Sequence, residues 1–227
     1  MNDDARSKSP RKGRFPWCGL APWLGLTTAP LLGPALLATA VLAVPLASPA
    51  QASVVQALDL AELVKRSDLI VVATARERSS RQQYRRRTIV TDVSLEVHES
   101  LRGGAAVGST LVVTRLGGRI GDLAMQVPGE ATFSLGERAL VFLRLNPSTG
   151  ELNCVGMSQG VMPIAMEQAE PMVIPGGQGA ALMHIEDDRL VSAGPALAQP
   201  LPLSTLRGQI SALIAAERGG SDGSPPR

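Results

Sequence analysis

Residues 88–99 of this 227-residue chain, TIVTDVSLEVHE, alternate between polar and apolar side chains. Successive side chains of a strand point to opposite faces of a sheet, so this period of two predicts a β-strand with one buried and one solvated face. The buried face would carry Ile89, Val93, Leu95 and Val97, and the solvated face Asp92, Ser94, Glu96 and His98. Such a strand is typical of an antiparallel sheet.

Further short strands are predicted along the chain, separated by turns rich in Gly, Pro and Asn. They lie at residues 68–77, 110–116, 123–127, 138–145, 152–157, 160–166 and 181–187. A short helix is expected at residues 58–67, where Asp59 and Glu62 form a capping-box pattern. A second helix is expected at residues 203–219, with Ser204 as N-cap and Gly219 as C-cap. This succession indicates a mainly β fold, a small barrel or sandwich with a helix at each end.

The first 52 residues have the features of an export signal. Basic residues outnumber acidic ones by five to two before Phe15, and no charged residue follows until Asp59. The segment Ala50-Gln51-Ala52 fits the small-x-small rule of signal peptidase. We therefore expect a signal peptide at residues 1–52, cut after Ala52 or alternatively after Ala50, and a periplasmic or secreted protein. A retained membrane anchor is the alternative, because the apolar run exceeds the roughly 20 residues that span a bilayer.

The predicted mature part, which begins at Ser53, is close to neutral. The signal has a net charge of +3 and the whole chain +2, which leaves 17 basic against 18 acidic residues. The basic character of the chain therefore belongs to the signal, and no nucleic-acid partner is expected. Cys154 is the only cysteine after the signal, so no intramolecular disulfide can form and an apolar core must stabilise the domain.

Three motifs carry a resemblance to known domains. They are the strand "SDLIVVATA", the alternating strand that ends in "ESLRGG", and "FSLGERALVFL". Over about residues 67–165 the chain resembles a widespread group of exported bacterial proteins and, more distantly, the netrin-like domains related to tissue inhibitors of metalloproteases. The resemblance implies a five-stranded OB-type antiparallel barrel. Those inhibitors act through an N-terminal cysteine, whereas the mature chain would begin near "SVVQALD", so their mechanism is not carried over.

The polar face of residues 88–99 suggests one candidate chemistry. Side chains two apart on a strand lie about 6.6 Å apart on one face, so Glu96 and His98 could share a zinc ion completed by His184 and Glu186. Alternation alone predicts the same residues, however. We interpret them as a solvated face and expect no metal and no cofactor.

A second candidate chemistry is the G-x-S-x-G pattern at residues 156–160, with Ser158 as nucleophile and Glu167 or Glu170 and then His184 as partners. This mechanism needs a helix after the serine, whereas residues 161–166 are strand-like, so we expect no catalytic residue. Cys154 lies in an apolar setting typical of a buried, unreactive thiol. The segments GGRIG and GGQG lack a phosphate-loop lysine and are interpreted as turns.

Residues 76–87, RERSSRQQYRRR, carry six arginines and one glutamate. We interpret them as an exposed loop between two strands. Guanidinium groups suit phosphate and carboxylate groups, and a tyrosine can stack beside them. The hypothetical anion-binding residues are Arg76, Arg78, Arg81, Tyr84, Arg85, Arg86 and Arg87. Their partner would be an anionic lipid headgroup, an acidic polysaccharide or an acidic protein, and the alternative is a merely solvated loop.

The expected organisation is a signal peptide at residues 1–52, an OB-like (netrin-like) β-barrel domain at residues 53–202 that includes the helix at 58–67, the C-terminal helix at 203–219, and a disordered tail at 220–227. The expected function is binding without catalysis. The alternatives are a hydrolase that uses Ser158 or a metal site of Glu96, His98 and His184, and a protease-inhibitor-like domain.

Overall fold

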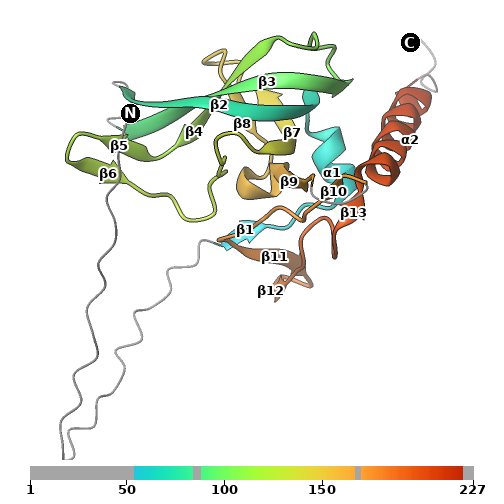
Figure 1. Ribbon diagram of the computed structural model, residues 1–227. Coiled ribbons are helices and arrows are strands. Elements are labelled where there is room, and N and C mark those ends of the chain that lie inside the picture. Colours follow the sequence, from blue (N-terminus) through green and yellow to red (C-terminus); the bar gives the residue numbers. More distant parts are fainter. Residues whose placement is uncertain (1–53, 84–87, 167–169, 222–227) are drawn as a thin grey trace, which may run out of the picture. The chain divides into compact units, whose positions relative to one another are not determined.

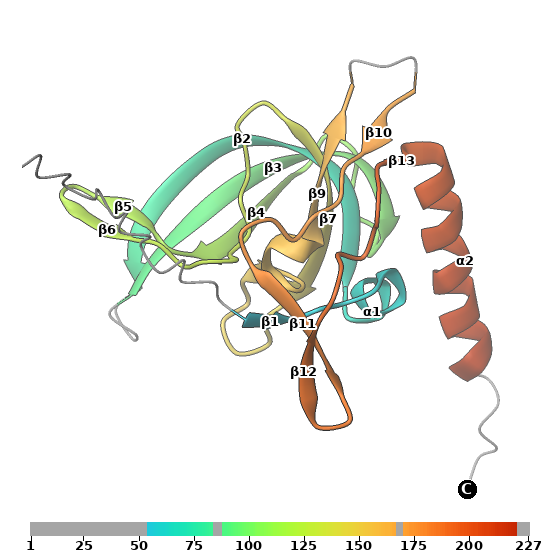
Figure 2. The same ribbon diagram turned by 90° about the horizontal axis from the view of Figure 1, so that it is seen from below.

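The fold of residues 54–83, 88–166 and 170–221 is described by a computed structural model. The predicted signal peptide at 1–52, its cut site and the end of the tail, 222–227, lie outside these residues. The described residues are mainly β, with 48% strand and 17% helix, as the repeated strand signals predict. Figures 1 and 2 show one large, curved sheet with the long C-terminal helix at one end.

The large sheet contains eight strands in the order β13-β10-β9-β7-β2-β3-β4-β8. Their bounds are Leu69–Gln83 for β2, Thr88–Arg102 for β3, Thr110–Leu116 for β4, Arg138–Leu145 for β7, Leu152–Cys154 for β8, Val161–Ala165 for β9, Met172–Val173 for β10 and Leu201–Pro202 for β13. Strand β8 also pairs with β7, so the hydrogen-bonded neighbours run from β7 through β2, β3, β4 and β8 back to β7. The β4–β8 pair is parallel, whereas the other neighbours are antiparallel.

Two small sheets complete the β structure. In the first, β1 (Val54–Gln56) runs parallel to β11 (Ala181–Glu186), which forms a hairpin with β12 (Arg189–Ser192). The second is the hairpin of β5 (Gly118–Ile120) and β6 (Leu123–Met125). This hairpin corrects two expectations. Part of GGRIG is strand β5 and not a turn, and the strand expected at 123–127 ends at Met125. Both strands are short and largely exposed, so they show no burial pattern in the sequence.

Strand β2 separates two apolar clusters, which explains its continuous apolar run. On one face, Ile70 and Val72 pack in a cluster with Phe142 and with both helices. On the other face, Val71 and Ala73 join a cluster with Val93, Leu95, Val97, Val113 and Val141. From Asp92 to His98 the alternation of β3 is as predicted, with Val93, Leu95 and Val97 buried and the polar residues between them partly exposed. Ile89, also expected on the buried face, is only half-buried, whereas Val90 and Thr91 are buried.

Both predicted helices are present, but α1 is shorter than the predicted 58–67 and α2 ends later than the predicted 203–219. Helix α1 spans Leu60–Lys65, and Asp59 caps it by accepting a hydrogen bond of 2.7 Å from the Glu62 amide. Helix α2 spans Leu203–Ser221 and buries Leu206, Ile210 and Ile214. Ser204 is therefore not its N-cap: β13 leads directly into the helix, and the Leu203 amide donates to the Pro171 carbonyl at 2.9 Å. Gly219, expected as the C-cap, lies inside the helix, which continues into the segment expected to be disordered.

Candidate anion-binding site

The described part of the arginine-rich stretch is strand and not loop, because residues 76–83 belong to β2 and pair with the start of β3. Two of its arginines form ion pairs with β3. Arg76 Nε lies 2.5 Å from Glu96 Oε2, and Arg81 Nε lies 2.6 Å from Asp92 Oδ2. Four members of the predicted site, Tyr84, Arg85, Arg86 and Arg87, lie outside the described residues. Arg76 and Arg81 are thus engaged within the protein.

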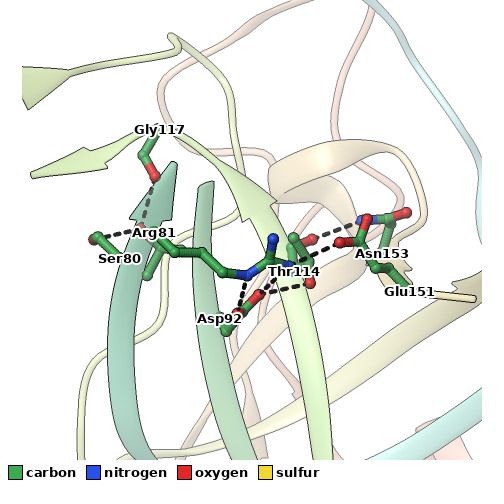
Figure 3. A network of polar contacts seen from close by, with 8 residues as sticks. Ser80, Arg81, Asp92, Thr114, Gly117, Glu151 and Asn153 are labelled. Carbon is green, nitrogen blue, oxygen red and sulfur yellow. Dashed lines mark hydrogen bonds and ion pairs between the residues drawn. The ribbon is translucent and has the colours of Figure 1, made fainter. Parts of the chain in front are cut away.

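Arg81 is the centre of a polar network on the outer face of the sheet, shown in Figure 3. Its guanidinium also contacts Glu151 at 2.8 Å, while the Thr114 hydroxyl donates to Asp92 at 2.8 Å. The Asn153 amide donates to the Thr114 carbonyl at 2.7 Å. Desolvation of Asp92 opposes its ionisation, but hydrogen bonds from Arg81 and Thr114 outweigh it, so the pKa of Asp92 lies below its ordinary value. The network connects β2, β3, β4 and β8, so its role is structural.

Arg78 points to the other face because the β2–β3 register shifts between Ala75 and Glu77. Directly opposed residues of two paired strands share a face, and a bulge changes which residues these are. After the shift, Arg78 opposes the buried Val93, and Ser80 opposes Thr91. On the next strand Arg115 opposes Thr91. Arg78 and Arg115 therefore lie on the same side of the sheet as the core, just beyond its last apolar residues.

These two arginines line an open groove with a volume of about 810 Å³. Its walls come from β2, β3, β4, the β5–β6 hairpin, the segment that follows this hairpin, and Gln178 and Gly179 ahead of β11. The lining includes three arginines, Arg78, Arg115 and Arg119, and one acidic residue, Glu130. Glu130 accepts hydrogen bonds from the Leu116 and Ala131 amides, at 3.3 and 3.0 Å, so two backbone N–H groups partly compensate its negative charge. The groove therefore has an excess of positive charge.

Two glycines allow the groove to form at the end of β4. Gly117 has a φ of +84°, and its carbonyl accepts a 2.6 Å hydrogen bond from the Thr91 hydroxyl. At Gly118 a Cβ atom would lie 2.3 Å from Thr91 Oγ1 and 2.5 Å from Ser80 Oγ. Only a residue without a side chain lets β5 cross so close to β2 and β3. The glycines thus place the β5–β6 hairpin, and Arg119 with it, beside Arg78 and Arg115.

The three groove arginines have no carboxylate partner among the described residues. Arg119 Nε donates to the Gly121 carbonyl at 3.0 Å, and Arg115 Nη1 reaches the Leu116 carbonyl at 3.5 Å. Because each guanidinium has five N–H donors, most donors of the three side chains remain available. Phosphate, sulfate and carboxylate oxygens match such donors in charge and geometry. Among the described residues that line the groove there is no histidine or cysteine.

Ser158, the nucleophile of the alternative hydrolase, lies in the short 3₁₀ helix η1 (Met157–Gly160), which β9 follows. Its side chain is buried, and its hydroxyl has no hydrogen-bond partner among the described residues. His184 lies in β11, and Glu170 accepts a hydrogen bond from Ser204. The other acid considered, Glu167, lies outside the described residues. The arrangement lacks the histidine contact that would activate a serine.

The residues considered as metal ligands have other partners. Glu96 pairs with Arg76, and His98 Nε2 lies 2.7 Å from the Thr74 hydroxyl. Burial, followed by the positive charge of Arg138, lowers the pKa of His98. His184 and Glu186 belong to the separate β1–β11–β12 sheet. In the part of the chain that is described, no three His, Cys, Asp or Glu residues are grouped to hold a metal ion.

Cys154 lies at the end of β8 and is partly exposed, packed against the apolar cluster of β2, β3, β4 and β7. Desolvation, followed by the negative charge of Glu130, raises the pKa of its thiol. The thiol is therefore protonated at neutral pH, the unreactive form of the side chain.

Sequence reasoning missed Arg115 and Arg119 and included Arg76 and Arg81. In "TLVVTRL", Arg115 lies two residues after Val113, and this spacing places it on the core-facing side of its strand. The sequence could thus have indicated Arg115, because it is a charged residue at a core-facing position near the end of a strand. No comparable signal marks Arg119, because its position depends on the β5–β6 hairpin.

No helix of the described segments has both the length and the apolar character needed to cross a membrane. The resemblance to netrin-like domains stays a prediction. Comparison of the chain with protein-family models, with curated proteins and with solved structures gives no match.

Proposed function

We propose that this protein is an exported, non-catalytic binding module that takes anionic groups in the groove of Arg78, Arg115 and Arg119. The observation that carries the proposal is the contrast between two sets of arginines. Arg76 and Arg81, on the outer face, are each paired with carboxylates, whereas the three groove arginines have no such partner among the described residues. Unpaired guanidinium groups gathered in one groove repel each other, and an anion relieves this repulsion.

We further propose that the ring of strand pairs is a small OB-like barrel. Its support is the cyclic pairing order β2-β3-β4-β8-β7 with a single parallel pair, β4–β8. OB-type barrels bind oligonucleotides and oligosaccharides across a face of their early strands, and ligand sites are frequent at barrel mouths. The groove lies over the first three strands of the ring. This comparison is an analogy of fold and supports a binding role without naming a ligand.

The partners that fit are anionic groups found outside the cytoplasm. Export is proposed from the basic, then apolar start of the chain and the small residues at Ala50–Ala52. Lipid headgroups, acidic polysaccharides and acidic proteins offer phosphate, sulfate or carboxylate groups, which arginine binds in the same bidentate way.

The proposal predicts that removing Arg78 and Arg115 weakens binding of a soluble polyanion. The double variant R78S/R115S should bind a fluorescent heparin oligosaccharide at least about tenfold more weakly than the unchanged protein at low salt, because each lost charge-assisted contact contributes about 1.5–3 kcal/mol. Binding of the unchanged protein should also weaken steeply as salt rises, because counterions screen the arginines.

The matched control is R144S/R189S. Both of these arginines are exposed, lie outside the groove and form no ion pair within the described residues, so this variant changes the net charge by the same amount. Equal weakening in the two variants would show that only net charge matters and would contradict a groove site. Unchanged binding in R78S/R115S would contradict it as well.

A further inference from the structure

The β5–β6 hairpin ends in an exposed apolar tip beside the arginine groove. Ile120 and Leu123 oppose each other across the turn, and they are 36% and 69% exposed. The same hairpin supplies Arg119 and Met125 to the groove lining. In Figures 1 and 2 this hairpin and helix α2 lie at opposite ends of the large sheet. A cationic groove and an apolar pair are thus presented together by one short element.

We propose that the groove and this tip together bind the surface of an anionic lipid membrane. The inference rests on the proposed function of the groove and adds its partner. In such a surface, phosphate groups lie directly above an apolar layer, so the arginines reach headgroups while Ile120 and Leu123 enter the boundary of the acyl chains. An acidic polysaccharide offers the same charges without an apolar layer and leaves the tip in water. The tip therefore favours the lipid surface.

A second exposed apolar hairpin, β11–β12, differs from the β5–β6 tip in the charge of its turn. In the β11–β12 hairpin, Leu190 and Val191 are 60% and 42% exposed, as apolar and accessible as the β5–β6 tip. Its turn, however, consists of Asp187 and Asp188, which an anionic surface would repel. The turn of β5–β6 has one acid, Asp122, and Arg119 precedes it by three residues. The β11–β12 tip carries three acids, Glu186, Asp187 and Asp188, against one base, Arg189, and so serves as a matched control with a net negative charge.

Insertion of the tip can be observed directly with tryptophan fluorescence. The sequence after residue 23 contains no tryptophan, and Trp17 and Trp23 contribute the same background to every variant. With vesicles of mixed phosphatidylglycerol and phosphatidylcholine, L123W should show a blue-shifted emission, and L190W should not. Vesicles of phosphatidylcholine alone should shift neither. An L123W emission that anionic vesicles leave unchanged would overturn the inference.

Co-sedimentation separates this inference from the proposed function. The variant I120S/L123S should bind anionic vesicles at least about tenfold more weakly, because two apolar side chains no longer enter the bilayer, and should keep its heparin binding. The control L190S/V191S should behave like the unchanged protein in both assays. If I120S/L123S binds vesicles normally, or loses vesicles and heparin alike, the lipid inference fails and the groove proposal stands. If R78S/R115S keeps full heparin binding, the groove proposal fails and the lipid inference with it.

Discussion

Arg78 and Arg81 lie three positions apart in the same strand and have different surroundings. Arg81 lies on the outer face and is held by Asp92 and Glu151. Arg78 lies on the core-facing side and contributes to the groove. Residues three apart in a strand point to opposite faces, and the register shift after Ala75 decides which of the two arginines shares a face with the core of β3. One irregular position in β2 thus decides which arginine joins the polar network and which one lines the groove.

The structural role of the Arg81 network predicts a pH-dependent effect at Asp92. A carboxylate whose folded pKa is depressed contributes stability above its unfolded pKa, about 3.9, and loses it as the pH falls through the folded value. Because the pKa of Asp92 is lowered, D92N should reduce the free energy of unfolding by about 1–2 kcal/mol at pH 7 and by progressively less below about pH 4. Urea unfolding at several pH values measures this.

The control for this experiment is E77Q. Glu77 is exposed on the same hairpin and forms no ion pair within the described segments, so its replacement should change stability by less than about 0.5 kcal/mol. A D92N effect that is equally large at pH 3 and pH 7 would show that shape, and not the Asp92 charge, explains the loss.

At the scale of elements, the strands that could be predicted from the sequence are those buried in the core. Strands β2 and β3 could be predicted because their core contacts impose a continuous apolar run in one and alternation in the other. The β5–β6 hairpin could not, because Ile120 and Leu123 are exposed and the paired glycines look like any turn. The groove depends on this hairpin and on the bulge in β2. The sequence therefore predicted an anion-binding site at residues 76–87, as a loop, but not which arginines line the groove.

The position of the β5–β6 hairpin should be sensitive to Gly118. A methyl group there would meet Thr91 Oγ1 at 2.3 Å, and the φ of +142° disfavours any side chain. We expect G118A to lower the free energy of unfolding by about 2–4 kcal/mol, because the clash and the backbone strain add. Chemical denaturation measures the change.

The same substitution in a helix should act in the opposite direction. Gly208 lies in α2, and a methyl group added there would meet no neighbouring side chain within 4 Å, so G208A should stabilise the protein by about 0.5–1 kcal/mol. A neutral effect of G118A would mean that β5 does not cross β2 and β3 as closely as described.

At the scale of the whole molecule, the described domain is stabilised without a disulfide and depends on its first strand. The buried Gln159 accepts a hydrogen bond from the Leu58 amide at 2.8 Å and donates one to the Gln56 carbonyl at 3.0 Å. Strand β1 also pairs with β11 from Val54 to Gln56. Loss of this strand would remove the Gln56 carbonyl and leave the buried Gln159 Nε2 with only its longer hydrogen bond to the Gly156 carbonyl, at 3.2 Å, among the described residues, which is costly. We therefore expect a stably folded form of the domain to keep Gln56.

This requirement agrees with a cut after Ala52, and we predict that the exported protein begins near Ser53. A chain that starts at Ser53 keeps β1 and the hydrogen bonds of Gln159 with Gln56 and Leu58, so it should unfold at the same urea concentration as the full chain. A chain that starts at Leu58 loses the Gln56 carbonyl and all of β1, and its free energy of unfolding should fall by about 2 kcal/mol or more. N-terminal sequencing and intact mass of exported material test the cut itself. Retention of Met1 would contradict it and favour a membrane anchor, and a stable Leu58 form would remove the structural reason for a cut ahead of β1.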